Sequence, residues 1–383
     1  MITIRLAAST KGQNTPHYRY ALQPLSPAAI FPQPAQDCEP PKRDRERAQA
    51  QYRQLWEQFI KALADIPASH QDRLDLWLDH FDTLFATFAH SIPAATAFRV
   101  KPEVSLYDHS KAVAALATAL WRWHHARGDA ADAIVAAQQQ RADWDEPKLL
   151  LIQGDLFGIQ DFIFASGGET QRRAAKLLRG RSFYVGLLTE CAAMRVLDAL
   201  ALPPTSQIIN AAGKFLIVAP NTDETRSALM TVRRGLDAWF LTHTFGQAGV
   251  GLAWLEASCN DFLSAPGDQP NSHQRFRTLM KRLFAQLDCA KAQRFDLCGD
   301  APPPAVFEGF LDRFDNRLGA CQIDGRSPAE LSEPHEGGTI ALSRLAKDQI
   351  DIGNWLTRFE RLLVTREGIG QHTLAVDVFG YRL

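Results

Sequence analysis

Asp155 is the first residue in this sequence whose type and position suggest a chemical role, because its carboxylate comes shortly after an apolar run. The run Leu149–Ile152 is continuous and apolar, which predicts a buried strand, and it leads into Gly154 and Asp155. A strand-end carboxylate can help to hold Mg²⁺, which usually binds one or two carboxylates together with phosphate oxygens. The sequence therefore nominates Gly154 and Asp155 for nucleotide binding, although Asp after a strand also commonly caps the following turn.

Basic side chains cluster shortly downstream of this carboxylate. Lys176, Arg179 and Arg181 stand near the start of a predicted helix, next to Arg172–Arg173 and after the Gly-rich loop Ser166–Gly168. Two interpretations fit this pattern: a solvated helix face, or a surface on which these three residues contact phosphate or an RNA backbone.

A histidine near the start of an earlier helix is the third candidate. Ser105 and Asp108 have the spacing of a capping box, which predicts a helix from there to about His124. His109 falls on the same predicted stripe as three apolar residues, Val113, Leu116 and Leu120. A histidine on an inward face is more often a core residue than a metal ligand, and the spacing alone does not decide between the two.

The elements that must position these residues follow a recognisable order. Apolar periodicity and turn signals predict strand, helix, strand, strand, helix and strand over 149–152, 172–200, 206–210, 214–219, 224–244 and 250–257. The two middle strands are separated by Ala211–Gly213, which fits a tight hairpin in which Gly213 takes the unusual dihedral. This βαββαβ order predicts an α+β protein with a ferredoxin-like domain of the polymerase or cyclase palm type.

A palm that activates nucleotides with two metal ions needs carboxylates at the end of its first strand and in its central hairpin turn. Asp155 satisfies the first requirement. The predicted hairpin turn, Asn210–Lys214, contains no acidic residue. The sequence therefore predicts a palm that can hold a nucleotide but is poorly equipped to activate one.

Several spaced motifs together resemble the first palm of the large subunit of type III-A (Csm) CRISPR effector complexes. They are Gly154-Asp-Leu-Phe-Gly158-Ile-Gln160, Ala175-Lys-Leu-Leu-Arg-Gly-Arg-Ser-Phe-Tyr184 and Ala212-Gly-Lys-Phe215. The resemblance implies that Gly158, Gly213 and Lys214 join Gly154 and Asp155 in binding nucleotide. In the family, a second palm with a Gly-Gly-Asp-Asp motif makes cyclic oligoadenylates from ATP, and this chain contains no such motif. The resemblance thus implies ATP and Mg²⁺ only together with a second palm, in a missing part or a neighbouring gene product.

The same resemblance extends to the helix that carries His109. Ser105-Leu-Tyr-Asp-His-Ser-Lys111 resembles the histidine motif of the HD nuclease domain, a single-strand DNase, and implies Asp108 and His109 as remnant ligands of a divalent transition metal. The His-Asp pair that completes such a site is missing, since neither His70 nor His80 has the expected context. We therefore expect a fragment or split form of the large subunit that is inactive as a nuclease on its own.

The family also carries a zinc ribbon, for which this chain keeps one ligand. Cys321 occupies the first cysteine position, whereas Asp324, Ser343 and Ala346 stand at the other three. Zinc needs four ligands in a structural site, so the sequence predicts no structural zinc and a segment held by ordinary packing.

Composition and length set the remaining expectations. With 42 basic and 43 acidic residues the net charge is −1, so any nucleic-acid contact must come from a local patch or from a partner. No apolar run approaches the roughly 20 residues of a membrane span, and we expect a cytoplasmic protein without membrane contact. Its expected partners are other Csm subunits and, through the complex, CRISPR RNA and target RNA.

Four regions are expected along the chain. They are short strands and an exposed linker (1–49), a partial helical HD-like domain (50–146), the palm (147–260), and a helix, the degenerate ribbon and terminal strands (261–383). The alternatives to a CRISPR subunit are a free-standing nucleotide cyclase or HD phosphohydrolase, and a ferredoxin-like RNA-binding protein.

Overall fold

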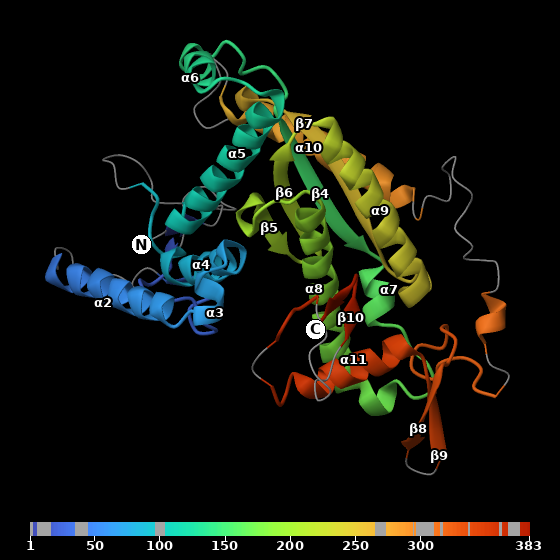
Figure 1. Ribbon diagram of the computed structural model, residues 1–383. Helices are drawn as coiled ribbons and strands as arrows, with labels where there is room; N and C mark the ends of the chain where they lie inside the picture. Colours follow the sequence, from blue (N-terminus) through green and yellow to red (C-terminus); the bar gives the residue numbers. More distant parts are fainter. Residues whose placement is uncertain are drawn as a thin grey trace, which may run out of the picture. The chain divides into compact units, whose positions relative to one another are not determined.

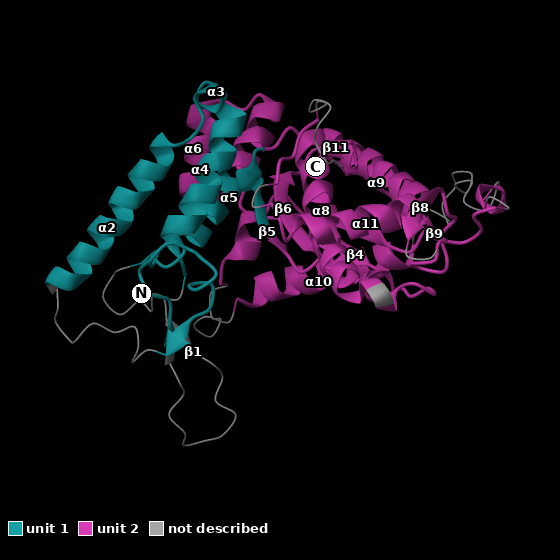
Figure 2. Ribbon diagram, turned by 90° about the horizontal axis from the view of Figure 1, so that it is seen from below, with its two compact units in different colours: residues 1–117, 203–208 teal, residues 118–202, 209–383 magenta. Residues whose placement is uncertain are grey.

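The computed structural model describes most of the chain and divides it into two compact units. Described are residues 3–5, 17–34, 45–95, 104–264, 273–293, 295, 310–314, 317–335, 338–359, 362–366 and 376–383. Unit 1 comprises residues 1–117 and 203–208, and unit 2 comprises residues 118–202 and 209–383 (Figure 2). The mixture of helices and small antiparallel sheets confirms the α+β class. The division falls inside a helix, away from the boundary expected at residue 146.

Unit 2 is built around a four-stranded sheet whose first strand lies inside it (Figure 1). The strands are β4 (Leu149–Phe157), β5 (Gln207–Ala211), β6 (Lys214–Pro220) and β7 (Gly249–Ala257), in the order β5-β6-β4-β7. β4 pairs antiparallel with both β6 and β7. The helices between them, α8 (Ala174–Ala199) and α9 (Asp223–Thr244), complete the predicted order of elements.

Local sequence explains how these elements begin and turn. Thr222 caps α9, because its side chain accepts a hydrogen bond from the backbone N–H of Thr225 at 3.2 Å. The β5–β6 hairpin has a two-residue turn in which Ala212 and Gly213 both have positive φ, 55° and 80°. Positive φ at both positions is the geometry of a type I′ turn, which matches the twist of the strands, and it makes Ala212 a strained residue there.

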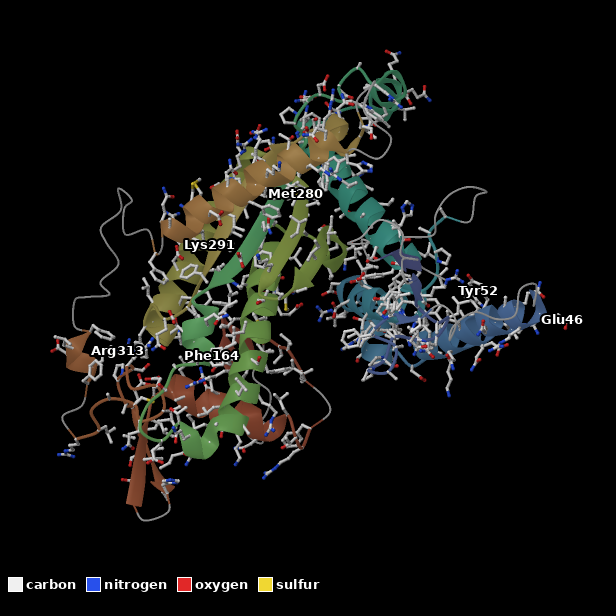
Figure 3. The ribbon with its side chains drawn as sticks, turned by 180° about the vertical axis from the view of Figure 1, so that it is seen from behind. Glu46, Tyr52, Phe164, Met280, Lys291 and Arg313 are labelled. Carbon is white, nitrogen blue, oxygen red and sulfur yellow. The ribbon has the colours of Figure 1, made fainter. Side chains whose placement is uncertain are left out.

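The two faces of the sheet are covered by different helices. Leu150, Ile152 and Leu252 belong to the core cluster that also contains the inward side chains of α8 and α9. Alternate residues of a strand point to opposite faces, so Gly251 faces the other side, where the side chain of Lys291 from α10 (Gln274–Ala292) lies. α10 contacts β7 and β4 and buries three leucines, Leu279, Leu283 and Leu287. Figure 3, seen from behind, shows α10 crossing this face.

The C-terminal part of unit 2 packs on α8 through glycines. It contains the hairpin of β8 (Leu331–His335) and β9 (Gly338–Leu342), followed by α11 (Arg344–Trp355), none of which the sequence predicted. A Cβ atom at Gly180 would lie 1.9 Å from the carbonyl oxygen of Gln349, and one at Gly353 would lie 2.2 Å from that of Lys176. The two helices therefore cross at a distance that only glycine permits at these positions.

The chain terminus forms a separate small sheet. β10 (Asp377–Val378) pairs with β11 (Tyr381–Arg382), and Thr365 bridges Arg382. The sequence predicted that runs 362–365 and 373–381 pair as a hairpin or join the palm sheet. They do not join the four-stranded sheet, and 373–375 lie outside the described residues.

Unit 1 consists of a small sheet and helices. The sheet has β1 (Thr3–Arg5), β2 (His17–Arg19) and β3 (Gln33–Pro34), so the two N-terminal β-like runs pair with each other. The helices are α2 (Arg45–Ala64), α3 (Ala68–Gln71) and α4 (Leu74–Ala89). α2 begins inside the segment expected to be an exposed linker, and 35–44 of that segment lie outside the described residues.

Short elements complete the fold. α5 (Leu106–Arg127) spans the division between the units, and α7 (Ile159–Ile163) follows β4. α6 (Ala131–Gln140) ends shortly before the boundary expected at residue 146, and its alanine and glutamine residues favour a helix despite their low hydrophobicity. Among the described helices, none combines the length and the hydropathy that crossing a bilayer requires.

Candidate functional site

The carboxylate of Asp155 lies two residues before the end of β4, enclosed by two lysines. Asp155 is 5% exposed, and its strand neighbours are Lys214 on β6 and Gly251 on β7. Its Oδ2 accepts a hydrogen bond from Nζ of Lys291 at 2.9 Å and lies 3.5 Å from Nζ of Lys214. The described hydrogen bonds of this carboxylate go to lysine and not to the following turn, so the alternative of a turn cap is wrong.

Lys291 reaches Asp155 because its neighbour on β7 has no side chain. A Cβ atom at Gly251 would lie 2.4 Å from Cγ of Lys291, closer than the two atoms can approach. The hydrogen bond with Asp155 is the main cause that raises the pKa of Lys291, which keeps the ammonium charged. The sequence did not predict a role for Lys291. A signal was present in Gly251, because a glycine inside a strand often marks a place where another part of the chain or a ligand comes close to the backbone.

Magnesium does not fit this arrangement. Mg²⁺ demands oxygen ligands in near-octahedral geometry, and at Asp155 the position next to the buried carboxylate is taken by an ammonium group. A second ammonium, that of Lys214, lies close by and would repel a divalent cation. The side chains around Asp155 in this chain therefore do not fit a magnesium ion, and no step through a metal ion is assigned to it; the binding of ATP and Mg²⁺ together with a second palm stays a prediction.

The three glycines nominated for nucleotide contact are accounted for by internal packing. A Cβ at Gly154 would lie 2.2 Å from the ring of Phe215, its partner across the sheet. One at Gly158, which has φ of 75°, would lie 2.3 Å from the carbonyl oxygen of Gln247. Gly213 supplies the second positive φ of the hairpin turn. These positions need glycine for the fold, whether or not a nucleotide binds.

Lys214 is the member of the nominated set that presents a charged group to solvent. Its side chain is 53% exposed, while Asp155 next to it is 7% exposed at the side chain. It begins β6 directly after the hairpin turn, so its ammonium is carried on a rigid element. Of the five nominated residues, Lys214 can contact a phosphate without any rearrangement of the sheet.

Arg181 has a structural position that contradicts its assignment to phosphate or RNA. It is 2% exposed, and its Nε donates to Oε1 of Gln349 at 2.9 Å. Its Nη1 donates to the carbonyl oxygens of Ile163, at 3.0 Å, and Ala165, at 2.6 Å. A guanidinium enclosed in this way joins α7, α8 and α11 and cannot reach a phosphate in solution.

The other two basic candidates remain on the surface. Lys176 and Arg179 are exposed, and Nη2 of Arg179 donates to the carbonyl oxygen of Gly353 at 3.3 Å. The Gly-rich loop beside them is occupied: a Cβ at Gly167 would lie 2.4 Å from the carbonyl oxygen of Gln322. This loop therefore supports the C-terminal region and does not form a cradle for phosphate.

Asp108 and His109 lie in the first turn of α5. The predicted capping contact is present, since Oγ of Ser105 accepts from the backbone N–H of Asp108 at 2.9 Å. The predicted inward stripe is wrong, because His109 and Val113 are exposed while Ala115 and Ala119 are buried. The two buried alanines are four residues apart and lie on one side of α5. The predicted stripe through His109 runs along a different side of the helix.

No metal centre is apparent around these residues within the described ranges. In the parts of the chain that the structure describes, no group of three His, Cys, Asp or Glu side chains could hold an ion. His70 and His80, the other histidine candidates, form a hydrogen bond to each other, with Nδ1 and Nε2 2.8 Å apart. The assignment of Asp108 and His109 to a metal stays a prediction.

The segment that resembles a zinc ribbon is held by hydrogen bonds and apolar packing. Oδ1 of Asp324 accepts from the backbone N–H groups of Arg326 and Ser327, each at 2.8 Å. Oγ of Ser343 accepts from the N–H of Ala346 at 3.2 Å and caps α11. Around these positions a small core is formed by Leu177, Cys321, Ile323, Ile340, Leu342, Ala346 and Ile350.

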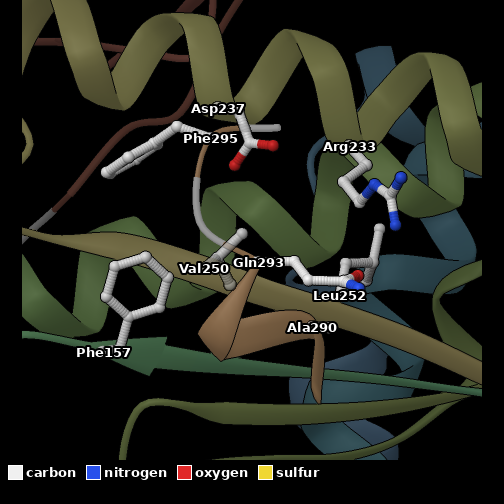
Figure 4. Close-up of a pocket in the computed structure, with 8 residues that line it drawn as sticks. All are labelled: Phe157, Arg233, Asp237, Val250, Leu252, Ala290, Gln293 and Phe295. Carbon is white, nitrogen blue, oxygen red and sulfur yellow. The ribbon is translucent and has the colours of Figure 1, made fainter. Parts of the chain in front are cut away.

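A small cavity lies beside β7 (Figure 4). Its volume is ≈ 20 Å³, which is room for about one water molecule. Phe157 and Phe295 line it, with ring centroids 5.9 Å apart, together with Arg233 and Asp237 of α9. A cavity of this size holds no nucleotide, and Phe157 fills a position near the end of β4 with an apolar ring.

Known proteins are similar to this chain over part of its length. Residues 148–301 match the family model described as Csm1 subunit domain B. A Cas10/Csm1 single-strand-specific deoxyribonuclease (subtype III-A) of Mycobacterium tuberculosis is 26% identical over 58% of this chain and 28% of its own length. The protein of the same description from Thermococcus onnurineus is 27% identical over 73% of this chain and 31% of its own length. The chain thus spans about a third of the length of these relatives.

Solved structures agree with this relationship. The Csm1-Csm4 cassette in complex with cA4 has a TM-score of 0.54 at 21% identity, covering 86% of this chain and 39% of that chain. Csm1 in T. onnurineus has a TM-score of 0.51 at 26% identity, covering 64% and 30%. At 21% identity the likeness to the cassette shows the fold alone. The chain is therefore similar to the Cas10/Csm1 large subunit of type III-A CRISPR systems, and the similarity to a family model, that of Csm1 subunit domain B, covers residues 148–301.

Proposed function

We propose that the chain is a subunit, or a portion of the large subunit, of a type III-A CRISPR effector, in which unit 2 acts as a scaffold and supplies one wall of a composite ATP site. The observation that carries this proposal is the match of residues 148–301 to Csm1 domain B. It is supported by the sheet order β5-β6-β4-β7 with α8 and α9 on one face, the arrangement of a ferredoxin-like palm.

The ligand of that wall is ATP, and the product of the completed site is a cyclic oligoadenylate. Support comes from structures of Csm1-Csm4 cassettes in complex with one ATP, with cA3 and with cA4. In this chain the wall offers Lys214, whose exposed ammonium would contact a phosphate, while Asp155 and Lys291 neutralise each other beneath it. The metal ion that ATP carries would be held by the partner palm, since Asp155 does not accept one.

The partners follow from the same relatives. Csm4 is the partner named in the cassette structures, so a Csm4-like subunit is the first partner proposed for this chain. A second palm is the other, and CRISPR RNA and target RNA are reached through the complex. The relatives are named single-strand-specific deoxyribonucleases. For this chain alone we propose no such activity, because the described residues bring no further ligands to Asp108 and His109.

The test compares the whole chain with a complex that also contains a second palm. ATP is titrated by calorimetry into the chain, into the second-palm protein and into their mixture, and the mixture is assayed for cyclic product. We expect tight binding and product only in the mixture. Lys214→Ala should weaken binding there about tenfold, the loss expected for one charge-assisted hydrogen bond.

The control variant is Arg195→Ala, which removes an exposed cation of the same unit from α8. It should bind ATP like the wild type. If Lys214→Ala and Arg195→Ala bind equally well, Lys214 does not face the nucleotide. If the second-palm protein alone binds ATP and makes product as well as the mixture does, the proposal of a composite site is wrong.

A further inference from the structure

The outer side of α10 carries a concentration of positive charge that the proposed function does not use. Four cations on this helix are exposed, namely Arg275, Arg277, Lys281 and Arg282. Within the described parts of the chain, none of these four makes a salt bridge or a side-chain hydrogen bond. The whole chain has a net charge of −1, so this is a local patch and not part of a general basic surface.

An exposed aromatic ring accompanies these charges. Phe284 is 46% exposed, although aromatic side chains gain most by burial, whereas the ring of Phe276, which is 37% exposed, packs against Phe262 with centroids 5.8 Å apart. Residues at spacings of three and four share one side of a helix, so Arg277, Lys281 and Phe284 form a continuous basic and aromatic strip. Figure 3, which labels Met280 and Lys291 on α10, shows the helix on the outside of unit 2.

A recess adjoins the other flank of the helix. Its volume is ≈ 290 Å³, and it is lined by Arg275, Thr278 and Arg282 together with Ser258, Asp261 and others. The acids of the recess are engaged locally: Oδ2 of Asp261 accepts from the N–H of Ser258 at 2.8 Å. Asp145 accepts from Nδ2 of Asn260 at 2.7 Å. The arginines are left as the groups available to an anionic ligand.

We propose that the exposed side of α10 binds a single-stranded nucleic acid directly. Phosphates would lie against Arg275, Arg277, Lys281 and Arg282, and unpaired bases would stack on Phe284, the combination by which single strands are generally held. A membrane surface fits less well, because the apolar side of the helix, with Leu279, Leu283 and Leu287, is buried against the sheet. An acidic protein would match the charges but would leave the rings without a role.

This inference goes beyond the proposed function, in which RNA is reached only through the complex. It is tested on the whole chain alone, by fluorescence anisotropy with labelled oligouridine and oligothymidine at a series of salt concentrations. We expect binding whose logarithmic salt slope is about −3, since four phosphate contacts contribute about −0.7 each for single strands. Comparing the two oligonucleotides shows whether RNA or DNA is preferred; binding of either supports the proposal.

Three variants separate the contributions. Arg277→Ala with Lys281→Ala should reduce the salt slope by about 1.4, because two phosphate contacts are lost. Phe284→Ala should weaken binding about tenfold with an unchanged slope, because a stacked base is lost while the charges remain. The matched control, Arg195→Ala with Arg234→Ala, removes two exposed arginines from α8 and α9 and should leave both quantities unchanged.

All of these side chains are exposed, so melting temperatures should stay close to that of the wild type. The proposal is overturned if no oligonucleotide binds, or if the control pair lowers the slope as much as the α10 pair. A different pair of results also overturns it: Phe284→Ala has no effect on binding, and dextran sulfate or polyglutamate displaces the labelled oligonucleotide as well as unlabelled oligouridine does at equal charge. That result would assign the patch to an acidic partner. Preferential binding to phosphatidylserine vesicles would assign it to a membrane.

Discussion

The end of β4 and the segment around Cys321 are both places where the family resemblance implies ligands, and they are held together by different physical means. At β4 the carboxylate is kept, and two lysines surround it. Around Cys321 the ligand positions hold Asp324, Ser343 and Ala346, which form a turn, a helix cap and part of an apolar core.

This difference shows how the fold stabilises each of the two regions. A buried carboxylate that remains must be neutralised, because an unpaired buried charge costs several kcal/mol, and Lys291 does so from a distant helix. Around Cys321 the buried carboxylate of Asp324 is stabilised by two backbone N–H groups, and short-range hydrogen bonds with apolar packing hold the rest of the segment. The first region should therefore respond to changes in charge and space, and the second to the loss of single hydrogen bonds.

The largest effect is expected at the buried cation Arg181. Arg181→Met should lower the free energy of unfolding by about 3–5 kcal/mol, because three acceptors, on α7, on the loop after it and on α11, lose their donor. Arg179→Met, at an exposed position of the same helix, should cost less than about 1 kcal/mol. Urea unfolding followed by tryptophan fluorescence measures both, and similar losses in the two variants would contradict the role given to Arg181.

The next effect concerns the space that Gly251 provides. Gly251→Ala should cost about 2 kcal/mol, because the new Cβ displaces Lys291 from Asp155. In a Lys291→Ala background the same substitution should cost almost nothing, since Cγ of Lys291 is gone. Thermal unfolding of the four proteins gives the coupling.

Gly235→Ala, at a helical position with nothing within 4 Å, is the control for adding a methyl group and should be neutral or stabilising. Additive costs of Gly251→Ala and Lys291→Ala would mean that the glycine does not serve the lysine, and the described route from α10 to Asp155 would be wrong.

A smaller effect is expected at Asp324. Asp324→Ala should destabilise unit 2 by about 1–2 kcal/mol, because two backbone N–H groups lose their acceptor. Asp324→Asn keeps a carbonyl oxygen that can accept, so its loss should be clearly smaller. Chemical denaturation distinguishes the two, and equal losses would indicate that the charge of Asp324 matters more than its hydrogen bonds.

The smallest effect is expected at the cap of α11. Ser343→Ala should cost about 1 kcal/mol and Ser343→Gly only a few tenths, the order found at helix N-caps. If Ser343 contributed mainly by filling core volume, the order would be reversed and glycine would be the worse substitution. A comparison of melting temperatures is therefore enough to decide between the two roles.

Elements with a clear apolar period could be predicted from the sequence. The helix predicted over 224–244 is α9 (Asp223–Thr244), and the strand predicted over 250–257 is β7 (Gly249–Ala257). The hairpin turn with Gly213 was also predictable, because a positive φ favours glycine. Periodicity failed for α6 and α11, whose polar or mixed sequences form helices through propensity and packing.

The candidate site was less predictable, because its contacts join distant parts of the chain. Asp155 and Lys291 are separated by 136 residues, and no local pattern announces their pairing. Arginine is rarely buried, so the sequence favours a surface position for Arg181, and two of its three acceptors are backbone carbonyl groups that any sequence would supply. His109 was placed on the wrong face of α5 because small alanines, not larger apolar residues, form the buried side.

The interior position of β4 also has a consequence for the order in which the protein is made. Its two neighbours in the sheet, β6 and β7, follow it in the chain, and β7 ends only at Ala257. Translation at roughly 5–20 residues per second leaves on the order of ten seconds between synthesis of β4 and of β7. During that interval Leu149–Ile152, later among the most deeply buried residues, keeps an open strand edge on the side that β7 will occupy, where another chain could pair with it.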